Sequence, residues 1–178
     1  MVEVFNQILS ILTLGLNVLF LVIILAIVFK RSTLDEKFFI FVKKYSYEFM
    51  FLLSVGGIVG SLIYSEIINF APCNLCWWQR VFLYPIAFIT TLALFKKDRT
   101  ANDYLLTLSI PGALIALYHS ALQISSNINP FLCTGLEEDC ATVYFVNFGF
   151  VTLPFMAFSV FALIAIIAFI SRNFENLK

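Results

Sequence analysis

Five long apolar stretches, separated by short segments that hold nearly all of the charged residues, make up most of the chain. A helix needs about 20 consecutive apolar residues to cross the hydrocarbon core of a bilayer, and each stretch is about that long. The pattern therefore predicts an all-α, polytopic membrane protein. The expected spans are residues 4–29, about 45–67, 73–95, about 104–122 and about 147–170.

The composition supports this prediction. The chain has 178 residues, of which 61% are hydrophobic and only 12% are charged, whereas about a quarter of the residues in a soluble domain are charged. A soluble globular domain is therefore excluded, and we expect one bundle whose surroundings are the lipid bilayer. The net charge of zero gives no reason to expect a nucleic-acid partner.

Positive charges indicate the topology. Ten of the eleven Lys and Arg residues fall in a linker (30–44), a turn (96–99) and a C-terminal tail (172–178), which the positive-inside rule places in the cytoplasm. The first stretch is flanked by Glu3 instead of a basic cluster, so we interpret it as a retained helix with its N-terminus outside. Both cysteine segments then face outward, where disulfides persist. The exception among the basic residues is Arg80, on the outer side.

The segment before the third stretch carries a C-x-x-C pair, Cys73 and Cys76. Their i, i+3 spacing places both sulfurs on one helix face, and Pro72 suits a helix start. Cys76 then lies in the first turn, where the helix dipole favours a thiolate. Arg80 lies one turn further on the same face and adds a fixed positive charge. This pattern predicts redox chemistry at the membrane surface.

The second cysteine pair, Cys133 and Cys140, has six residues between its members, in a loop. A disulfide here is easy to close and contributes roughly 2–3 kcal/mol in the chain-entropy model. The apolar residues 130–132 suit docking beside a partner, and the acidic residues 137–139 disfavour a thiolate at the second cysteine. Two pairs on one side of the membrane allow thiol–disulfide exchange between them. Two structural disulfides are the alternative; a four-cysteine zinc site is disfavoured on the oxidising side, and we expect no metal.

Other residues have both a structural and a functional interpretation. His119, the single histidine, lies near the outer end of the fourth stretch, and either bonds between helices or contacts a redox cofactor. Trp77 and Trp78 suit the aromatic belt of a membrane, or a wall for a planar ring. Gly56 and Gly60 form a G-x-x-x-G pair, which predicts close packing of a neighbouring helix.

Taken together, these features resemble the DsbB/BdbC family of membrane disulfide bond formation proteins. The resemblance covers roughly residues 45–170. It implies a four-helix bundle, residues 45–178. The first apolar stretch has no counterpart in that pattern, so we expect residues 1–44 to form an additional N-terminal transmembrane helix and a cytoplasmic linker. The motifs that carry it are Cys73-x-x-Cys76 with Trp77, Gln79 and Arg80; Tyr118 with His119; Pro130 to Cys133; Cys140; and Phe148 to Phe155.

The resemblance also implies an activity, that of a thiol:quinone oxidoreductase. Such a protein supports disulfide formation in extracytoplasmic proteins by reoxidising a DsbA-like thioredoxin-fold partner. It implies a bound quinone, ubiquinone or menaquinone, in exchange with the membrane quinone pool. The implied location is the bacterial cytoplasmic (inner) membrane, with the cysteine loops facing the periplasm or exterior.

The family pattern assigns an order to the sulfurs. Cys133 would form the mixed disulfide with the partner, and Cys140, once freed, would attack Cys73. The residues that would face the quinone are Cys76, released as a thiolate, with Arg80 and His119.

Two alternatives remain from the sequence. A vitamin K epoxide reductase-like protein uses the same chemistry in a related bundle, but there the loop pair usually precedes the C-x-x-C pair, and here it follows. A non-catalytic membrane scaffold with structural disulfides would also contain four cysteines. Trapping a mixed disulfide with a reduced partner at Cys133 distinguishes an enzyme from a scaffold.

Overall fold

The computed structural model describes residues 2–29, 40–96, 100–124, 133 and 140–173. Within these ranges it has five helices that are long and apolar enough to cross a membrane, which confirms the predicted all-α polytopic architecture. A π-helix, η1 (Ile63–Ile67), continues the second of them. The five helices are α1 (Val2–Phe29), α3 (Ser46–Leu62), α4 (Asn74–Lys96), α5 (Asn102–Ile124) and α6 (Leu153–Asn173).

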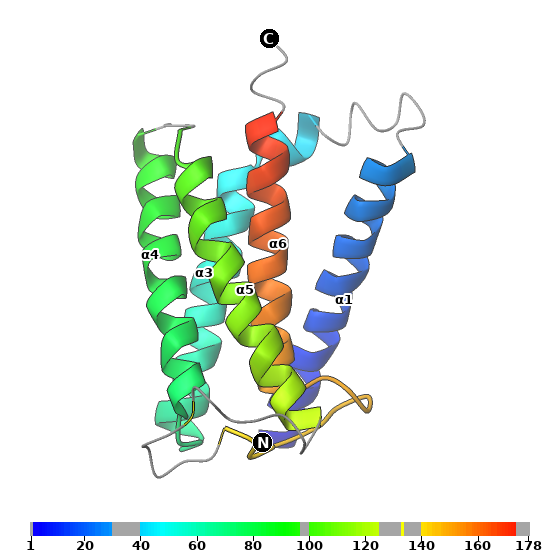
Figure 1. The fold of residues 1–178 in the computed structure, drawn as a ribbon, viewed down its shortest axis with the longest axis vertical. Coiled ribbons are helices and arrows are strands. Elements are labelled where there is room, and N and C mark those ends of the chain that lie inside the picture. The colour runs from blue at the N-terminus through cyan, green and yellow to red at the C-terminus, as the bar shows by residue number, and fades with distance from the viewer. Residues whose placement is uncertain (1, 30–39, 97–99, 125–132, 134–139, 174–178) are drawn as a thin grey trace.

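Helices α3, α4, α5 and α6 form a four-helix bundle in which each helix contacts the next around a ring (Figure 1). The closest approach is between α5 and α6, where Gly112 faces the buried ring of Phe161. A Cβ at Gly112 would lie 2.5 Å from that ring, so only glycine fits there. The shared core includes Met50, Leu83, Ile86, Leu105, Phe161 and Ile164.

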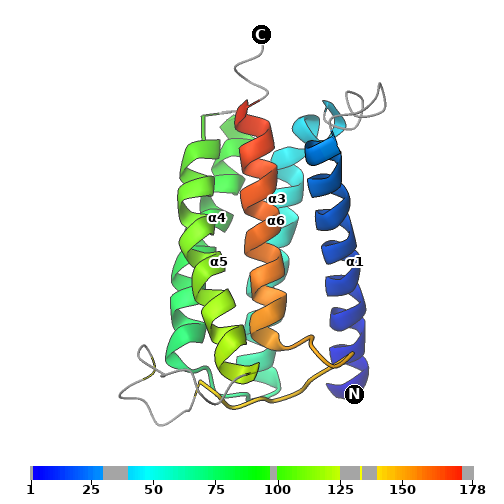
Figure 2. The ribbon, with the colours of Figure 1, turned by 45° about the vertical axis from the view of Figure 1, so that its right-hand side comes forward.

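Helix α1 stands at the side of this bundle, next to α6 (Figure 2). Its outward positions are apolar and its inward stripe is polar, which suits a helix whose outer face contacts lipid. The Oδ1 atom of Asn6 accepts a hydrogen bond of 2.7 Å from the hydroxyl of Tyr64. The Nδ2 atom of Asn17 donates one of 2.9 Å to Ser159 on α6. The inward polar residues are Asn6, Ser10, Thr13 and Asn17.

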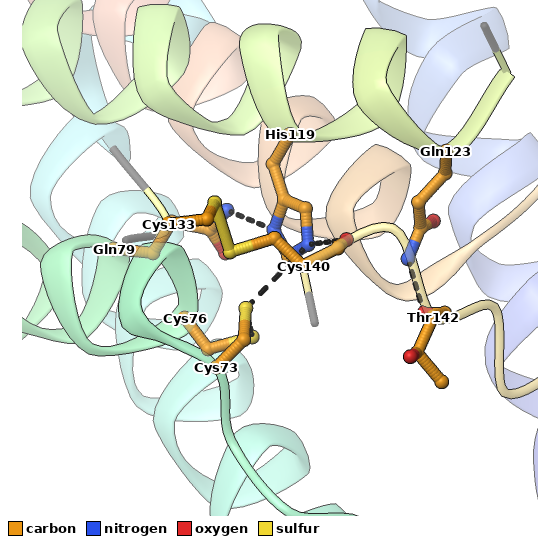
Figure 3. The surroundings of a disulfide bond; sticks show 8 residues. All are labelled: Cys73, Cys76, Gln79, His119, Gln123, Cys133, Cys140 and Thr142. Carbon is orange, nitrogen blue, oxygen red and sulfur yellow. Dashed lines mark hydrogen bonds between the residues drawn. A yellow bond between two sulfur atoms is a disulfide. The ribbon is translucent and has the colours of Figure 1, made fainter. Parts of the chain in front are cut away.

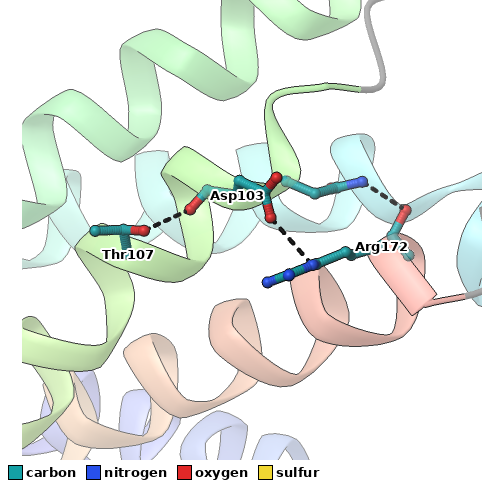
Figure 4. A network of polar contacts seen from close by, with 5 residues as sticks. Asp103, Thr107 and Arg172 are labelled. Carbon is teal, nitrogen blue, oxygen red and sulfur yellow. Dashed lines mark hydrogen bonds and ion pairs between the residues drawn. The ribbon is translucent and has the colours of Figure 1, made fainter.

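The two ends of the bundle differ in chemistry. The N-terminus of α1, the start of α4 and the segment after Cys140 share one end, and the end of α6 lies at the other (Figures 1 and 2). At that opposite end, Arg172 Nε lies 3.1 Å from Asp103 Oδ1 (Figure 4). Both side chains are exposed, so this ion pair adds little stability. Most of the basic linker, the turn at 97–99 and the tail from 174 fall outside the described residues.

The fifth helix begins later than the sequence pattern predicts. We expected a span from about residue 147, but α6 begins at Leu153. The backbone N–H of Asn147 bonds to the carbonyl of Val151, and that of Val151 bonds back, which closes a tight turn. Phe148 (φ 53°) and Gly149 (φ 81°) occupy the left-handed region inside it. Because a right-handed helix cannot contain two such residues in succession, an apolar segment here is a turn.

Candidate functional site

The first cysteine pair lies where α4 begins. The carbonyl of Cys73 accepts a 3.2 Å hydrogen bond from the N–H of Trp77, so Cys73 caps the helix and Cys76 lies in its first turn. The two Sγ atoms are 3.2 Å apart (Figure 3). The i, i+3 spacing has therefore brought both sulfurs to one face, as predicted. This separation is close enough for the pair to exchange between dithiol and disulfide with little movement.

The second pair lies directly against the first. Cys133 and Cys140 are joined by a disulfide, and Cys140, only 1% exposed, packs in one apolar cluster with Cys73, Leu75 and Leu122. Segments of the chain about 60 residues apart are thus adjacent at one end of the bundle. Since exchange requires only that one sulfur reach another, the arrangement suits transfer between the pairs.

His119, from the last turns of α5, connects the two pairs. Its Nδ1 atom is 3.2 Å from Nε2 of Gln79, and its Nε2 atom is 3.1 Å from the backbone carbonyl of Cys140 and 3.7 Å from Sγ of Cys73. An amide nitrogen donates only, so Nδ1 accepts and Nε2 carries the hydrogen. In this tautomer the imidazole donates from Nε2 toward both cysteine segments (Figure 3). The interhelical hydrogen bond, one of the two alternatives for this residue, is present as the contact with Gln79 on α4. Contact with a redox cofactor stays a prediction.

The environment of Cys73 favours its thiolate. The hydrogen bond from the Cys76 thiol, and then that from His119, outweigh burial and lower the pKa of Cys73 from 9 to about 4. In the reduced protein, Cys73 is therefore ionised at neutral pH. The helix-dipole argument had predicted the low pKa for Cys76. The tertiary contact with His119 is the contribution that the sequence did not reveal.

A cavity of about 320 Å³ opens beside the C-x-x-C pair. Cys76 is part of its wall, whereas Cys73 is not. One end is polar, because Gln79, Arg80 and His119 line it together with Cys76. The remainder is lined mainly by aliphatic side chains from α1, α3 and α6. A ligand with a polar head and an apolar body fits this distribution.

The G-x-x-x-G pattern predicted that Gly56 and Gly60 pack against a neighbouring helix. Instead, both residues line this cavity. A Cβ added at either position would meet no atom within 4 Å. Their lack of a side chain therefore widens the cavity. The close helix contact of this segment is made by the intervening Gly57, whose Cβ would lie 3.1 Å from Leu83.

Arg80 is only 5% exposed, and its guanidinium is held by the preceding helix. Its Nε donates to Oγ of Ser61 over 2.9 Å; a terminal nitrogen donates to Oγ of Ser65 over 2.8 Å and to the carbonyl of Ser61 over 3.1 Å. The ring of Trp77 lies 5.0 Å from the guanidinium carbon, a cation–π distance. These contacts, and not a hydrogen bond to Cys76, fix Arg80 in the cavity wall.

Sequence reasoning missed both serines. Their i, i+4 spacing on a helix, with an unexplained arginine downstream, was the available signal. Neither tryptophan lines the cavity, so the predicted tryptophan wall for a planar ring is absent among the described contacts. Stacked aromatic side chains take that position: Phe70 and Tyr144 have ring centroids 4.2 Å apart, and both line the cavity.

The hydroxyl of Tyr144 donates to the carbonyl of Ala71 over 2.9 Å, next to Pro72 and Cys73. This bond and the Phe70 stack fasten the segment after Cys140 to the segment before α4. The apolar residues 130–132 and the acidic residues 137–139 fall outside the described residues.

Comparison with known proteins identifies the family. Residues 43–171 match the model of the family described as "Disulfide bond formation protein DsbB". An SPbeta prophage-derived disulfide bond formation protein B of Bacillus subtilis is 44% identical over 115 residues, covering 65% of this chain and 77% of the relative. Disulfide bond formation protein C of the same species is 38% identical (65% and 83% covered), and a probable disulfide formation protein of Chlamydia caviae is 34% identical (75% and 96% covered). No solved structure matches the chain. The chain therefore belongs to the DsbB family and is a disulfide-forming oxidoreductase of the membrane.

Proposed function

We propose that the protein is a thiol:quinone oxidoreductase that reoxidises a DsbA-like thioredoxin-fold partner. The observation that carries this proposal is the position of Cys76. Its side chain faces a cavity with one polar end, while its neighbour Cys73 packs against the Cys133–Cys140 disulfide. The C-x-x-C pair thus has one sulfur toward a second disulfide and the other toward a ligand site.

The difference in exposure between the loop cysteines supports an entry point for electrons. Cys133 is partly exposed, whereas Cys140 is fully buried. A partner thiolate therefore reaches Cys133 first, forms a mixed disulfide there and releases Cys140 as a thiolate. The second thiol of the partner then displaces Cys133, which leaves the partner oxidised and the loop pair reduced.

Transfer between the pairs follows from their contact. Cys140 attacks Cys73 of the oxidised C-x-x-C pair and breaks the Cys73–Cys76 bond, so Cys76 leaves as a thiolate that faces the cavity. Cys133 then attacks Cys140, re-forms the loop disulfide and leaves Cys73 reduced. His119, which donates toward Cys73, favours Cys73 as the leaving thiolate in this last step. The same two electrons have then moved from the partner to the C-x-x-C pair.

The cavity fits a quinone. Ubiquinone and menaquinone both combine a polar ring with an apolar tail, which matches the polar end and the aliphatic remainder of the lining. A bound quinone would accept two electrons and two protons from the dithiol and leave as quinol, which restores the Cys73–Cys76 disulfide. Arg80 would donate to a ring oxygen, because its guanidinium lines the polar end. His119 lines the same end and would contact the ring, while its Nε2–H stays directed at the cysteine segments.

We also propose the cellular arrangement. The protein resides in the bacterial cytoplasmic (inner) membrane with the cysteine end facing the periplasm or exterior, as the distribution of basic residues predicts. The family match begins at residue 43, which supports a division into residues 1–44 and a DsbB-like domain at 45–178.

Reconstitution tests the proposal. The purified protein, a reduced DsbA-like protein and menadione should together give stoichiometric partner disulfide and quinol, measured by thiol titration and by quinone absorbance. Cys133→Ala should abolish partner oxidation, while Cys76→Ser should still form the mixed disulfide yet reduce no quinone. Partner oxidation that continues without any quinone consumed would contradict the proposal, as would a fully active Cys76→Ser variant.

A further inference from the structure

Helix α1 is outside the family match, which begins at residue 43. Nevertheless, four of its residues border the cavity beside Cys76: Leu9, Leu12, Thr13 and Leu16. They recur at i, i+3, i+4 and i+7, the spacing of one helix face. The site at the C-x-x-C pair therefore includes a wall that the relatives' shared region does not supply.

The bundle holds this wall by hydrogen bonds at three levels. Asn6 accepts a hydrogen bond from Tyr64. Ser10 accepts one from Nδ2 of Asn147 over 2.8 Å. Asn17, further along α1, bonds to Ser159 on α6. Polar bonds of this kind are specific inside a membrane, because lipid offers them no competing partner. Since Tyr64 belongs to η1 and itself lines the cavity, the first bond connects α1 directly to the cavity wall.

The cavity is polarised along its length. Its guanidinium, amide and imidazole groups come from α4 and α5, and hydroxyl groups of α3 and η1 lie beside the guanidinium. Every residue that α1 contributes is aliphatic except Thr13. The Thr13 hydroxyl donates to the carbonyl of Leu9 in its own helix over 2.8 Å, so its hydrogen is not directed at a ligand. Opposite α1, the side-chain-free positions Gly56 and Gly60 leave open space. A long, flexible, apolar group fits between these surfaces.

We infer that α1 is the tail-binding wall of the quinone site, and that it gives the protein a preference for quinones with an isoprenoid tail over tailless ones. This inference rests on the proposed function. The reacting ring would contact α4 and α5, and the tail would contact the aliphatic face of α1. Removing side chains from that face should therefore weaken tail binding and spare ring binding.

The test measures binding and does not depend on turnover. The two tryptophans, Trp77 and Trp78, lie in the first turns of α4, and a quinone at the proposed site quenches their fluorescence. The dissociation constants of menadione, which has no tail, and of a menaquinone with an isoprenoid tail are measured by this quenching in detergent. The variant is Leu9→Ala/Leu12→Ala, and the control is Ile8→Ala/Ile11→Ala.

The control is matched most closely at one position. Ile11 is 61% exposed and Leu12 is 58% exposed, but only Leu12 borders the cavity. We expect the variant to bind tailed menaquinone roughly fivefold more weakly and menadione with less than about a twofold change, since the loss is of packing contacts and not of water exclusion. The control should bind both as the natural protein does.

The outcomes separate the two proposals. If neither quinone quenches the natural protein saturably, the quinone assignment itself fails. If both bind but the variant leaves their ratio unchanged, α1 is not the tail wall, and equal losses in variant and control overturn the inference as well. Should the double variant lose its helical circular dichroism, Leu12→Ala alone, a truncation of an exposed side chain, is measured against Ile11→Ala.

Discussion

The two serines that hold Arg80 allow its position to be changed while its charge stays in place. Ser61→Ala/Ser65→Ala removes the two hydroxyl acceptors and leaves only the carbonyl of Ser61. A hydrogen bond to a charged group contributes about 1.5–3 kcal/mol. The guanidinium borders a cavity, so it can replace part of the lost hydrogen bonding by turning or by binding water. We therefore expect the free energy of unfolding to fall by about 2–3 kcal/mol when both bonds are removed.

Two measurements follow from this change. Denaturant unfolding in detergent, followed by helical circular dichroism, should show the lower free energy of unfolding. Because a displaced guanidinium no longer presents its donors to the ligand, quinone affinity should fall on the order of tenfold, equivalent to about 1.4 kcal/mol. Arg80→Lys should lose a similar amount of affinity, since an ammonium keeps the charge but lacks the planar fork.

Ser54 supplies the control. It is fully buried on the same helix, but its Oγ bonds to the carbonyl of Phe51 within that helix and it does not line the cavity. Ser54→Ala should change the free energy of unfolding by less than about 0.5 kcal/mol and leave quinone affinity unaltered. A double serine variant as stable as the natural protein would contradict the role of these hydrogen bonds. A variant that is destabilised while its quinone affinity stays within twofold would contradict the role of Arg80 in binding.

Three further changes test other parts of the structure. Gly112→Ala drives a methyl group into the buried ring of Phe161 and should lower the free energy of unfolding by about 1–3 kcal/mol, measured by denaturant titration. In the reduced protein, the ultraviolet thiolate absorbance of Cys73 should persist as pH falls and disappear only near pH 4, and Cys76→Ala should move that midpoint toward 9, because it removes the main cause of the lowered pKa. Asp103→Asn breaks an exposed ion pair and should shift the free energy of unfolding by less than about 1 kcal/mol.

The first two of these have a further check. Gly56→Ala introduces the same methyl group into open space and should not destabilise, so equal losses at Gly56 and Gly112 would contradict the packing argument. Because the pKa of Cys73 is lowered on folding, the thiolate stabilises the reduced protein above pH 9, and that contribution decreases steadily toward pH 4. A reduced protein whose stability rises on acidification through this range would contradict the assignment.

The membrane character, the number of spans and the family could all be predicted from the order of the amino acids. Apolar runs of about 20 residues fix spanning helices because lipid offers no partner for exposed backbone groups. The C-x-x-C pair was equally readable, since a spacing of three residues on a helix leaves little freedom for the two sulfurs.

The surroundings of those sulfurs became known only from the packing of the helices. His119, Arg80 and Cys140 acquire their partners from segments at least 15 residues away, and no local pattern specifies which segments meet. The roles of Gly56 and Gly60 were misjudged for the same reason, because the motif states what is missing from one helix but not what faces it. The cavity, including the contribution of α1, exists only through the packing of several helices, and that packing depends on contacts distant in sequence.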